Sequence, residues 1–167
     1  MNEDIKEILN NFLKQAKTDS LKTSHYPHNY SNLKLRVSFG QGTPTKIPWI
    51  SFLGEGQKTS KGIYPVFLYY NYDELEKLIL AYGISETNEP SISWNLPKNT
   101  QTIEEYFISS LNTKPFKYGD SYVYAIYDTN AQLDWNQIEK DLSNLIKEYK
   151  EVLKSGDLVK ENNTEQL

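Results

Sequence analysis

Three successive apolar runs, each about the length of a β-strand, place the strongest constraint on the fold. They cover residues 33–39, 47–54 and 62–70 and read LKLRVSF, IPWISFLG and GIYPVFLYY. The first alternates apolar and polar residues with the period of a half-buried strand, and Lys34 and Arg36 lie on its polar face. The other two are rich in aromatic and β-branched residues, and a polar turn separates them. The middle of the chain therefore predicts a β-sheet.

Helical patterns flank these runs on both sides. Apolar residues recur at helical spacing from Ile5 to Ala16, which predicts an amphipathic opening helix. Asp134 with Gln137 can cap a long final helix whose apolar positions run to Leu153. We therefore predict a single α+β domain with a mixed or antiparallel curved sheet, flanked by the N- and C-terminal helices.

The second half of the chain predicts three shorter elements and a tail. Apolar residues in 75–82 predict a short helix that ends at Gly83 as its C-cap. Residues 102–105, TIEE, form a capping box that begins another helix, and residues 122–128, YVYAIYD, predict a strand. Residues 155–167 are polar and contain a glycine, so we predict a linker or tail there.

Composition excludes several classes of site. The 167 residues contain no cysteine, so a disulfide framework, a cysteine zinc site and a thiol nucleophile are all ruled out. His25 and His28 have poor spacing for a metal pair, and we interpret them as surface residues. The usual serine hydrolase, zinc protease and P-loop signatures do not occur. We therefore predict no catalytic residue, no metal site and no enzymatic activity for this chain.

Hydropathy gives no sign of a membrane partner. No stretch approaches the roughly 20 apolar residues of a membrane span, and the acidic start MNEDIKEILNNFLKQ lacks the features of a signal peptide. We expect a cytoplasmic protein.

Charge is divided unevenly along the chain, although the net charge is only -4. Residues 11–70 contain eight Lys or Arg and two Asp or Glu, a local charge of +6, whereas residues 71–167 contain nine Lys and seventeen Asp or Glu. Such asymmetry is typical of a protein with one side facing a polyanion. The alternative interpretation is a lysine-rich surface that serves only solubility.

Aromatic residues are dense in and beside the basic segment. They are Trp49, Phe52, Tyr64, Phe67, Tyr69 and Tyr70. Flat rings next to Lys and Arg are what a site for unstacked nucleic-acid bases requires. The same rings could equally form the hydrophobic core.

One loop brackets a single polar residue with two glycines. Gly40 and Gly42 free the backbone on each side of Gln41, which predicts an exposed tip that approaches a ligand. The alternative is an ordinary turn between two strands.

Five runs together carry a resemblance to a known family. They read YPHNYSNLKLRVSFGQG, IPWISFLGEGQ, GIYPVFLYY, DELEKLILAYGISETNEP and KYGDSY. In order and spacing they resemble the N-terminal DNA-recognition domains of the McrB family, GTPase subunits of methylation-dependent restriction endonucleases. The resemblance spans roughly residues 5–155. It implies that residues 1–154 bind DNA and that residues 155–167 lead toward an AAA+ GTPase module outside this sequence.

The resemblance also implies a mechanism and a set of residues. Family members bind duplex DNA and extrude a 5-methylcytosine that follows a purine, which is base flipping. The base stacks between rings that match Trp49 and Tyr118, and Tyr64 and Leu68 match further positions of the pocket wall. Gly119, directly after Tyr118, suits a ligand-facing loop.

Further residues are expected to contact the DNA backbone, and one is expected to fill the gap left by the extruded base. Between the two glycines the family carries a tyrosine that enters the gap left by the base, and Gln41 stands there in this chain. We call the loop of Gly40, Gln41 and Gly42 the finger, and we expect the basic residues around it to contact phosphates. They are Lys34, Arg36, Lys46, Lys58 and Lys61.

Partners and cofactors follow from the same resemblance. Methylated double-stranded DNA is the expected ligand, and a McrC-like nuclease is the expected partner of the full-length protein. GTP and magnesium belong to the downstream module, so no cofactor is expected here. The alternative function is a protein-interaction module of a defence complex that uses the same aromatic face.

Overall fold

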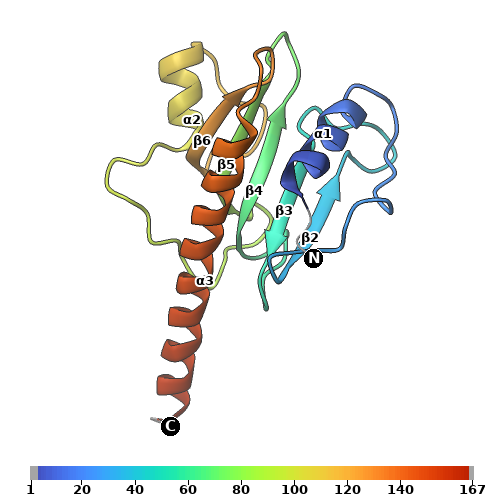
Figure 1. The fold of residues 1–167 in the computed structure, drawn as a ribbon. Helices are drawn as coiled ribbons and strands as arrows, with labels where there is room; N and C mark the ends of the chain where they lie inside the picture. The colour runs from blue at the N-terminus through green and yellow to red at the C-terminus, as the bar shows by residue number, and fades with distance from the viewer. Residues whose placement is uncertain (1–3, 166–167) are drawn as a thin grey trace.

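A six-stranded antiparallel sheet forms the centre of the fold (Figure 1). The computed structural model describes the backbone of residues 4–165 and the side chains of residues 4–156, and the strands counted here lie in that part. Strand order follows the chain, so the sheet is a meander with the antiparallel pairing allowed for in the prediction. The strands are β1 (Asn29–Tyr30), β2 (Leu33–Ser38), β3 (Trp49–Leu53), β4 (Ile63–Tyr70), β5 (Lys77–Ile84) and β6 (Tyr122–Asp128).

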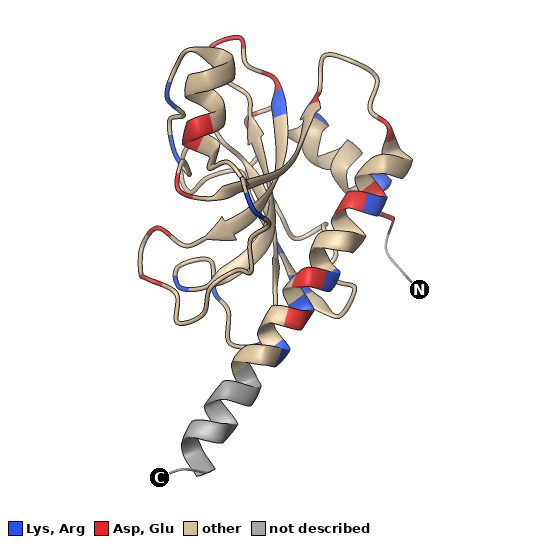
Figure 2. Ribbon diagram, turned by 90° about the vertical axis from the view of Figure 1, so that its left-hand side faces the viewer, with Lys and Arg blue, Asp and Glu red and all other residues tan. Residues whose placement is uncertain are grey.

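Helices cover the two faces of the sheet unequally. They are α1 (Ile5–Gln15), α2 (Ile103–Tyr106), the π-helical turn η1 (Phe107–Leu111) and α3 (Trp135–Glu165). The N-terminal helix α1 and the long helix α3 pack on one face, and α2 with η1 packs on the other (Figures 1 and 2). A single α+β domain results, as predicted.

Two hydrophobic cores hold these layers together. On the α1 and α3 face, Phe12 and Tyr149 pack against strand residues such as Phe52 and Phe67, all fully buried. Burying each such ring stabilises the fold by about 1.5–3 kcal/mol before the loss of conformational entropy is counted.

The second core lies between the sheet and the short helical segment α2–η1. Ile103 and Phe107 cover Leu68 and Ile79 of the central strands. Because β4 and β5 face one core on each side, nearly every residue in them is buried.

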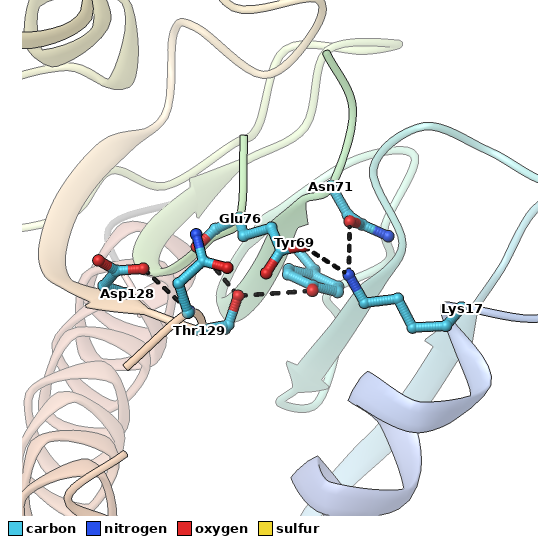
Figure 3. Close-up of polar contacts among 7 residues, drawn as sticks. Lys17, Tyr69, Asn71, Glu76, Asp128 and Thr129 are labelled. Carbon is cyan, nitrogen blue, oxygen red and sulfur yellow. Dashed lines mark hydrogen bonds and ion pairs between the residues drawn. The ribbon is translucent and has the colours of Figure 1, made fainter. Parts of the chain in front are cut away.

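A polar network fastens the end of α1 to the sheet (Figure 3). The ammonium group of Lys17 lies 3.1 Å from the Glu76 carboxylate and donates to Asn71 at 2.9 Å. Thr129 donates its hydroxyl hydrogen to the Glu76 carbonyl at 3.0 Å, which brings the end of β6 into the same network. The ion pair is partly exposed, so it contributes at most about 1 kcal/mol.

Most of the predicted elements are confirmed. The opening helix is α1, and the runs at 33–39, 47–54, 62–70 and 122–128 contain β2, β3, β4 and β6. The capping box also forms, because Thr102 accepts from the Glu105 amide while Glu105 accepts from the Thr102 amide. Asp134 accepts from the Gln137 amide at 3.1 Å and so caps the start of α3.

The predicted helix at 75–82 is wrong, because these residues lie in and just before β5. The apolar run is buried on both faces between β4 and β6, and a run of that kind satisfies helical and strand spacing equally well. Gly83 is therefore no helix cap. It lies opposite Tyr64 in the ladder, where a Cβ would collide with the Tyr64 backbone and approach its ring.

The backbone of the C-terminal segment is helical. Helix α3 continues without a break from Trp135 to Glu165 and so includes residues 155–165 of the predicted linker or tail. Whether this segment leads to a further domain stays a prediction. Despite its length, neither α3 nor another described helix is apolar enough to cross a membrane.

Candidate functional site

Four side chains expected from the resemblance line one pocket. Trp49, Tyr64, Leu68 and Tyr118 surround a cavity of about 260 Å³ on the sheet face that carries α2. Trp49 and Leu68 are direct cross-strand neighbours on β3 and β4, so their side chains emerge side by side. Tyr64 lies further along β4, and Tyr118 comes from the loop before β6.

The loop that carries Tyr118 is held at both of its sides. The hydroxyl of Tyr70 donates to the Lys117 carbonyl at 2.9 Å, and the amide of Phe116 donates to the Tyr72 hydroxyl at 2.9 Å. Tyr118 itself has a φ of +68°, a left-handed conformation that is costly for a residue with a side chain. The sequence interpretation assigned this freedom to Gly119, whereas the positive φ belongs to Tyr118. Strain of this kind clusters at ligand sites.

Burial raises the pKa of both pocket tyrosines. For Tyr64 the pKa rises to about 12, chiefly through burial and then through the nearby Tyr118 and Glu86. For Tyr118 burial again raises the pKa most, the Glu86 carboxylate raises it further, and the adjacent Trp49 side chain opposes the rise. Both hydroxyls therefore remain protonated donors at neutral pH. That of Tyr64 donates to the Thr59 carbonyl at 3.0 Å.

A broad groove of about 930 Å³ adjoins the pocket. Trp49, Thr59 and Ser60 line both cavities, so the pocket lies along the side of the groove. Lys34, Arg36 and Lys58 also line the groove, and all three are exposed. The outer face of β2 thus presents cations next to an aromatic pocket.

Two other predicted phosphate contacts lie outside the groove lining. Lys46 is exposed with its ammonium group over the Phe116 ring at 4.7 Å and the Tyr72 ring at 5.9 Å. Lys61 is exposed in the turn before β4, where its backbone pairs with Lys58. The basic segment therefore does not gather all its cations on one surface.

The glycine-bracketed loop has the conformation predicted for it. Gly40 and Gly42 have φ values of +112° and +76°, and a Cβ at Gly40 would collide with the backbone of Thr43 and Thr45. Gln41 is exposed between them and lines the groove together with Gly40. The loop therefore carries one polar side chain at the wall of the basic groove.

Several pocket residues were missed by sequence reasoning. Glu86 and Thr87 reach the pocket from the turn after β5, and Lys117 reaches it beside Tyr118. Glu86 is a carboxylate on a turn that lines the pocket. Its position in the run SETNEP carries no signal of this kind. Among the described residues no three His, Asp or Glu side chains come together as a metal site.

The left-handed backbone at Tyr118 makes a prediction about stability. Tyr118→Gly should unfold with a free energy about 1 kcal/mol higher than that of Tyr118→Ala, because only glycine is free of strain at φ +68°. At the neighbouring Lys117, which has no positive φ, alanine should be the more stable of the same two substitutions. Urea denaturation of the four variants measures both differences. If alanine were the more stable at Tyr118 as well, the loop would not hold this conformation in solution.

Most of the chain is similar in sequence to known proteins. A family profile described as "MrcB-like, N-terminal domain" matches residues 2–154. The "Type IV methyl-directed restriction enzyme EcoKMcrB subunit" of Escherichia coli (strain K12) is 43% identical over 156 residues, which cover 92% of this chain and 34% of that relative. The chain thus spans about a third of the relative's length. On the extent of the profile match and this identity, the chain belongs to the family of MrcB-like N-terminal domains.

Proposed function

We propose that this domain binds duplex DNA and receives an extruded 5-methylcytosine in the pocket formed by Trp49, Tyr64, Leu68 and Tyr118. The observation that carries the proposal is that these four side chains, drawn from two strands and a loop, line one cavity beside a basic groove. The family relative is named as a subunit of a methyl-directed restriction enzyme, which supports a methylated base as the ligand.

The dimensions of the site favour extrusion over reading of the intact helix. A base inside a duplex is stacked on both faces, so it can occupy a pocket of about 260 Å³ only after it leaves the helix. Trp49 and Tyr118 then provide π-surfaces for the extruded base, and Leu68 provides apolar contact for a C5-methyl group. We expect the base before the cytosine to be a purine, as the family resemblance implies.

The groove supplies the contacts to the DNA backbone. Lys34, Arg36 and Lys58 line it, and cations along a groove attract phosphates whatever the base sequence. Lys46 and Lys61 are exposed outside the lining and would reach phosphates beyond the extruded nucleotide. Together these side chains would set the position of the duplex over the pocket.

Gln41 is the proposed finger that fills the vacancy in the duplex. It is exposed in a turn, and the glycine on each side of it has a positive φ. Extrusion leaves a guanine without its partner, and the amide of Gln41 can donate to and accept from that base. Glutamine stacks less well than the family's tyrosine, so its contribution would come mainly from hydrogen bonds.

In a longer protein the domain would act as a targeting module. Its relative is about three times as long as the matched segment, so the nuclease-linked activity of a type IV restriction system would require regions outside this chain. We expect a McrC-like nuclease as partner and a GTPase module that binds GTP and magnesium, with the whole assembly in the cytoplasm. The domain alone would bind DNA without catalysis.

A protein-interaction module is the second candidate function. The observation that favours it is the exposure of two large apolar side chains, Ile108 at 49% and Phe116 at 56%. Both belong to η1 and the loop that follows it, next to the aromatic pocket. A protein surface of this kind would bind DNA weakly and show little dependence on salt.

The aromatic pocket predicts a loss of affinity when a ring is removed. Tyr118→Ala and Trp49→Ala should each weaken binding to a duplex with one 5-methylcytosine by about 1–3 kcal/mol, the scale of base stacking. Tyr118→Phe keeps the ring and should bind nearly as well as the wild type. Fluorescence anisotropy measures the affinities. Phe116→Ala is the matched control, since it removes an exposed ring from the same loop outside the pocket; equal losses for Phe116→Ala and Tyr118→Ala would contradict a base between the rings.

The groove predicts a change in salt dependence. Arg36→Gln should lower the slope of log affinity against log salt by about 0.9, because one phosphate contact is lost, and should leave the preference for methylated DNA unchanged. Lys14→Gln, on the helix that covers the opposite face of the sheet, should leave the slope as it is. An unchanged slope for Arg36→Gln would place the DNA elsewhere, and a flat slope for the wild type would favour the protein-interaction function.

The finger predicts a dependence on base pairing. Gln41→Gly should weaken binding to a fully paired methylated duplex, because nothing then offsets the few kcal/mol lost on extrusion. The loss should be much smaller when the methylated base lies opposite an abasic site, where pairing is already absent. Fluorescence of 2-aminopurine at the target position rises when the base leaves the stack and reports extrusion directly. If Gln41→Gly extrudes the base and binds the paired duplex as well as the wild type does, Gln41 does not fill the gap and the loop is only a turn between two strands.

A further inference from the structure

Apolar contacts alone cannot distinguish 5-methylcytosine from thymine. A methyl group at C5 is present on 5-methylcytosine and also on every thymine. Stacking and dispersion contacts are nearly the same for the two bases, because they act on the ring faces and the methyl group. The bases differ at C4, where cytosine carries an amino donor and thymine a carbonyl acceptor, and at N3, which accepts in cytosine and donates in thymine. At C4, a polar group that only accepts would select against thymine.

Among the side chains of the described residues that line the pocket, one has such a group. Thr59, Ser60, Thr87 and Ser121, like the two pocket tyrosines, carry hydroxyls, and a hydroxyl both donates and accepts, so it suits either base. Lys117 only donates and would favour the thymine carbonyl. Glu86 is the carboxylate of the lining, and an ionised carboxylate only accepts.

A pinned turn presents Glu86 to the pocket. Ser85 is buried. Its hydroxyl accepts from the Gly62 amide at 2.9 Å and donates to the Asn88 carbonyl. Asn88 in turn donates its backbone and side-chain N–H groups to the Ser60 carbonyl at 3.1 and 3.2 Å. The turn that bears Glu86 is thus fastened to the segment that forms the neighbouring wall, which fixes the backbone from which the Glu86 side chain extends.

Electrostatics favour a specific partner for this carboxylate. Glu86 is exposed at the pocket and close enough to raise the pKa of both Tyr64 and Tyr118. A negative charge beside a groove for a polyanion repels phosphate and so lowers the general affinity. A donor of the ligand that meets the carboxylate offsets this cost.

We propose that Glu86 accepts a hydrogen bond from the C4 amino group of the extruded base and thereby makes the pocket select 5-methylcytosine against thymine. This inference rests on the proposed function of the pocket. Carboxylates accept from the cytosine amino group in known recognition of bases, and one good side chain–base contact gives roughly 5- to 150-fold discrimination. In thymine the C4 oxygen would face the carboxylate, and the two acceptors would repel each other.

The test compares two methylated pyrimidines under equal costs of extrusion. Duplexes carry 5-methylcytosine or thymine opposite an abasic site, so that neither base has a pairing partner to lose. The wild type should prefer 5-methylcytosine by roughly 5- to 150-fold. Glu86→Gln should reduce this preference to near unity, because an amide can accept from the amino group and can also donate to the thymine oxygen. Glu89→Gln removes the same charge three residues away, outside the pocket lining, and should keep the wild-type preference.

Each outcome bears on a different claim. A wild type that prefers 5-methylcytosine over both cytosine and thymine, with the preference over thymine lost only in Glu86→Gln, supports the inference. A Glu86→Gln variant that keeps its ratio, or that changes both affinities by the same factor, overturns the role of Glu86 while leaving the pocket function intact. A wild type that does not prefer 5-methylcytosine over unmodified cytosine in a paired duplex overturns the proposed function and the inference with it.

Discussion

The site depends on the unequal covering of one β-sheet. Helices α1 and α3 bury the first face, whereas α2 and η1 cover only the β4–β6 part of the second. On that second face, β2 and β3 therefore present the groove lining, including Arg36 and Leu53, instead of a second core. Trp49 and Tyr64 lie where the cover ends, and each is half-buried. The pocket is the boundary between a packed core and an open surface, which is why it joins apolar walls to a charged groove.

Hydrogen bonds hold the loops at this boundary. The amides of Ile103 and Glu104, at the start of α2, donate to the Ser121 and Gly119 carbonyls at 2.8 and 3.1 Å. Helix α3 reaches the opposite wall, since the Tyr149 hydroxyl accepts from the Gly54 amide at 2.9 Å. Segments far apart in the chain thus hold the rims of the pocket and groove, and a preformed site loses less entropy when it binds.

Sequence patterns could predict the elements whose spacing has one interpretation. The alternation in β2, the capping box at Thr102 and the cap at Asp134 each specify a local structure, and each is found. The run that forms β5 satisfies two periodicities, and only its burial between β4 and β6 decides between them. The pocket rings were identified through family resemblance, because their convergence depends on strand register. No local pattern marks Glu86, whose place is set by hydrogen bonds across the sheet.

Charge on the folded domain does not follow the division of the sequence into a basic and an acidic segment. The basic stretch divides between the groove, the rings under Lys46 and the ion pair of Lys17, and the coloured part of α3 carries both signs (Figure 2). In the proposed complex, affinity for DNA would depend on a few cations in the groove and not on the net charge. The Glu86 carboxylate would lower that affinity except where a base presents an amino group to it. Specificity would then be obtained by weakening the wrong complexes, which is a physical reason for an acidic residue to lie beside a basic groove.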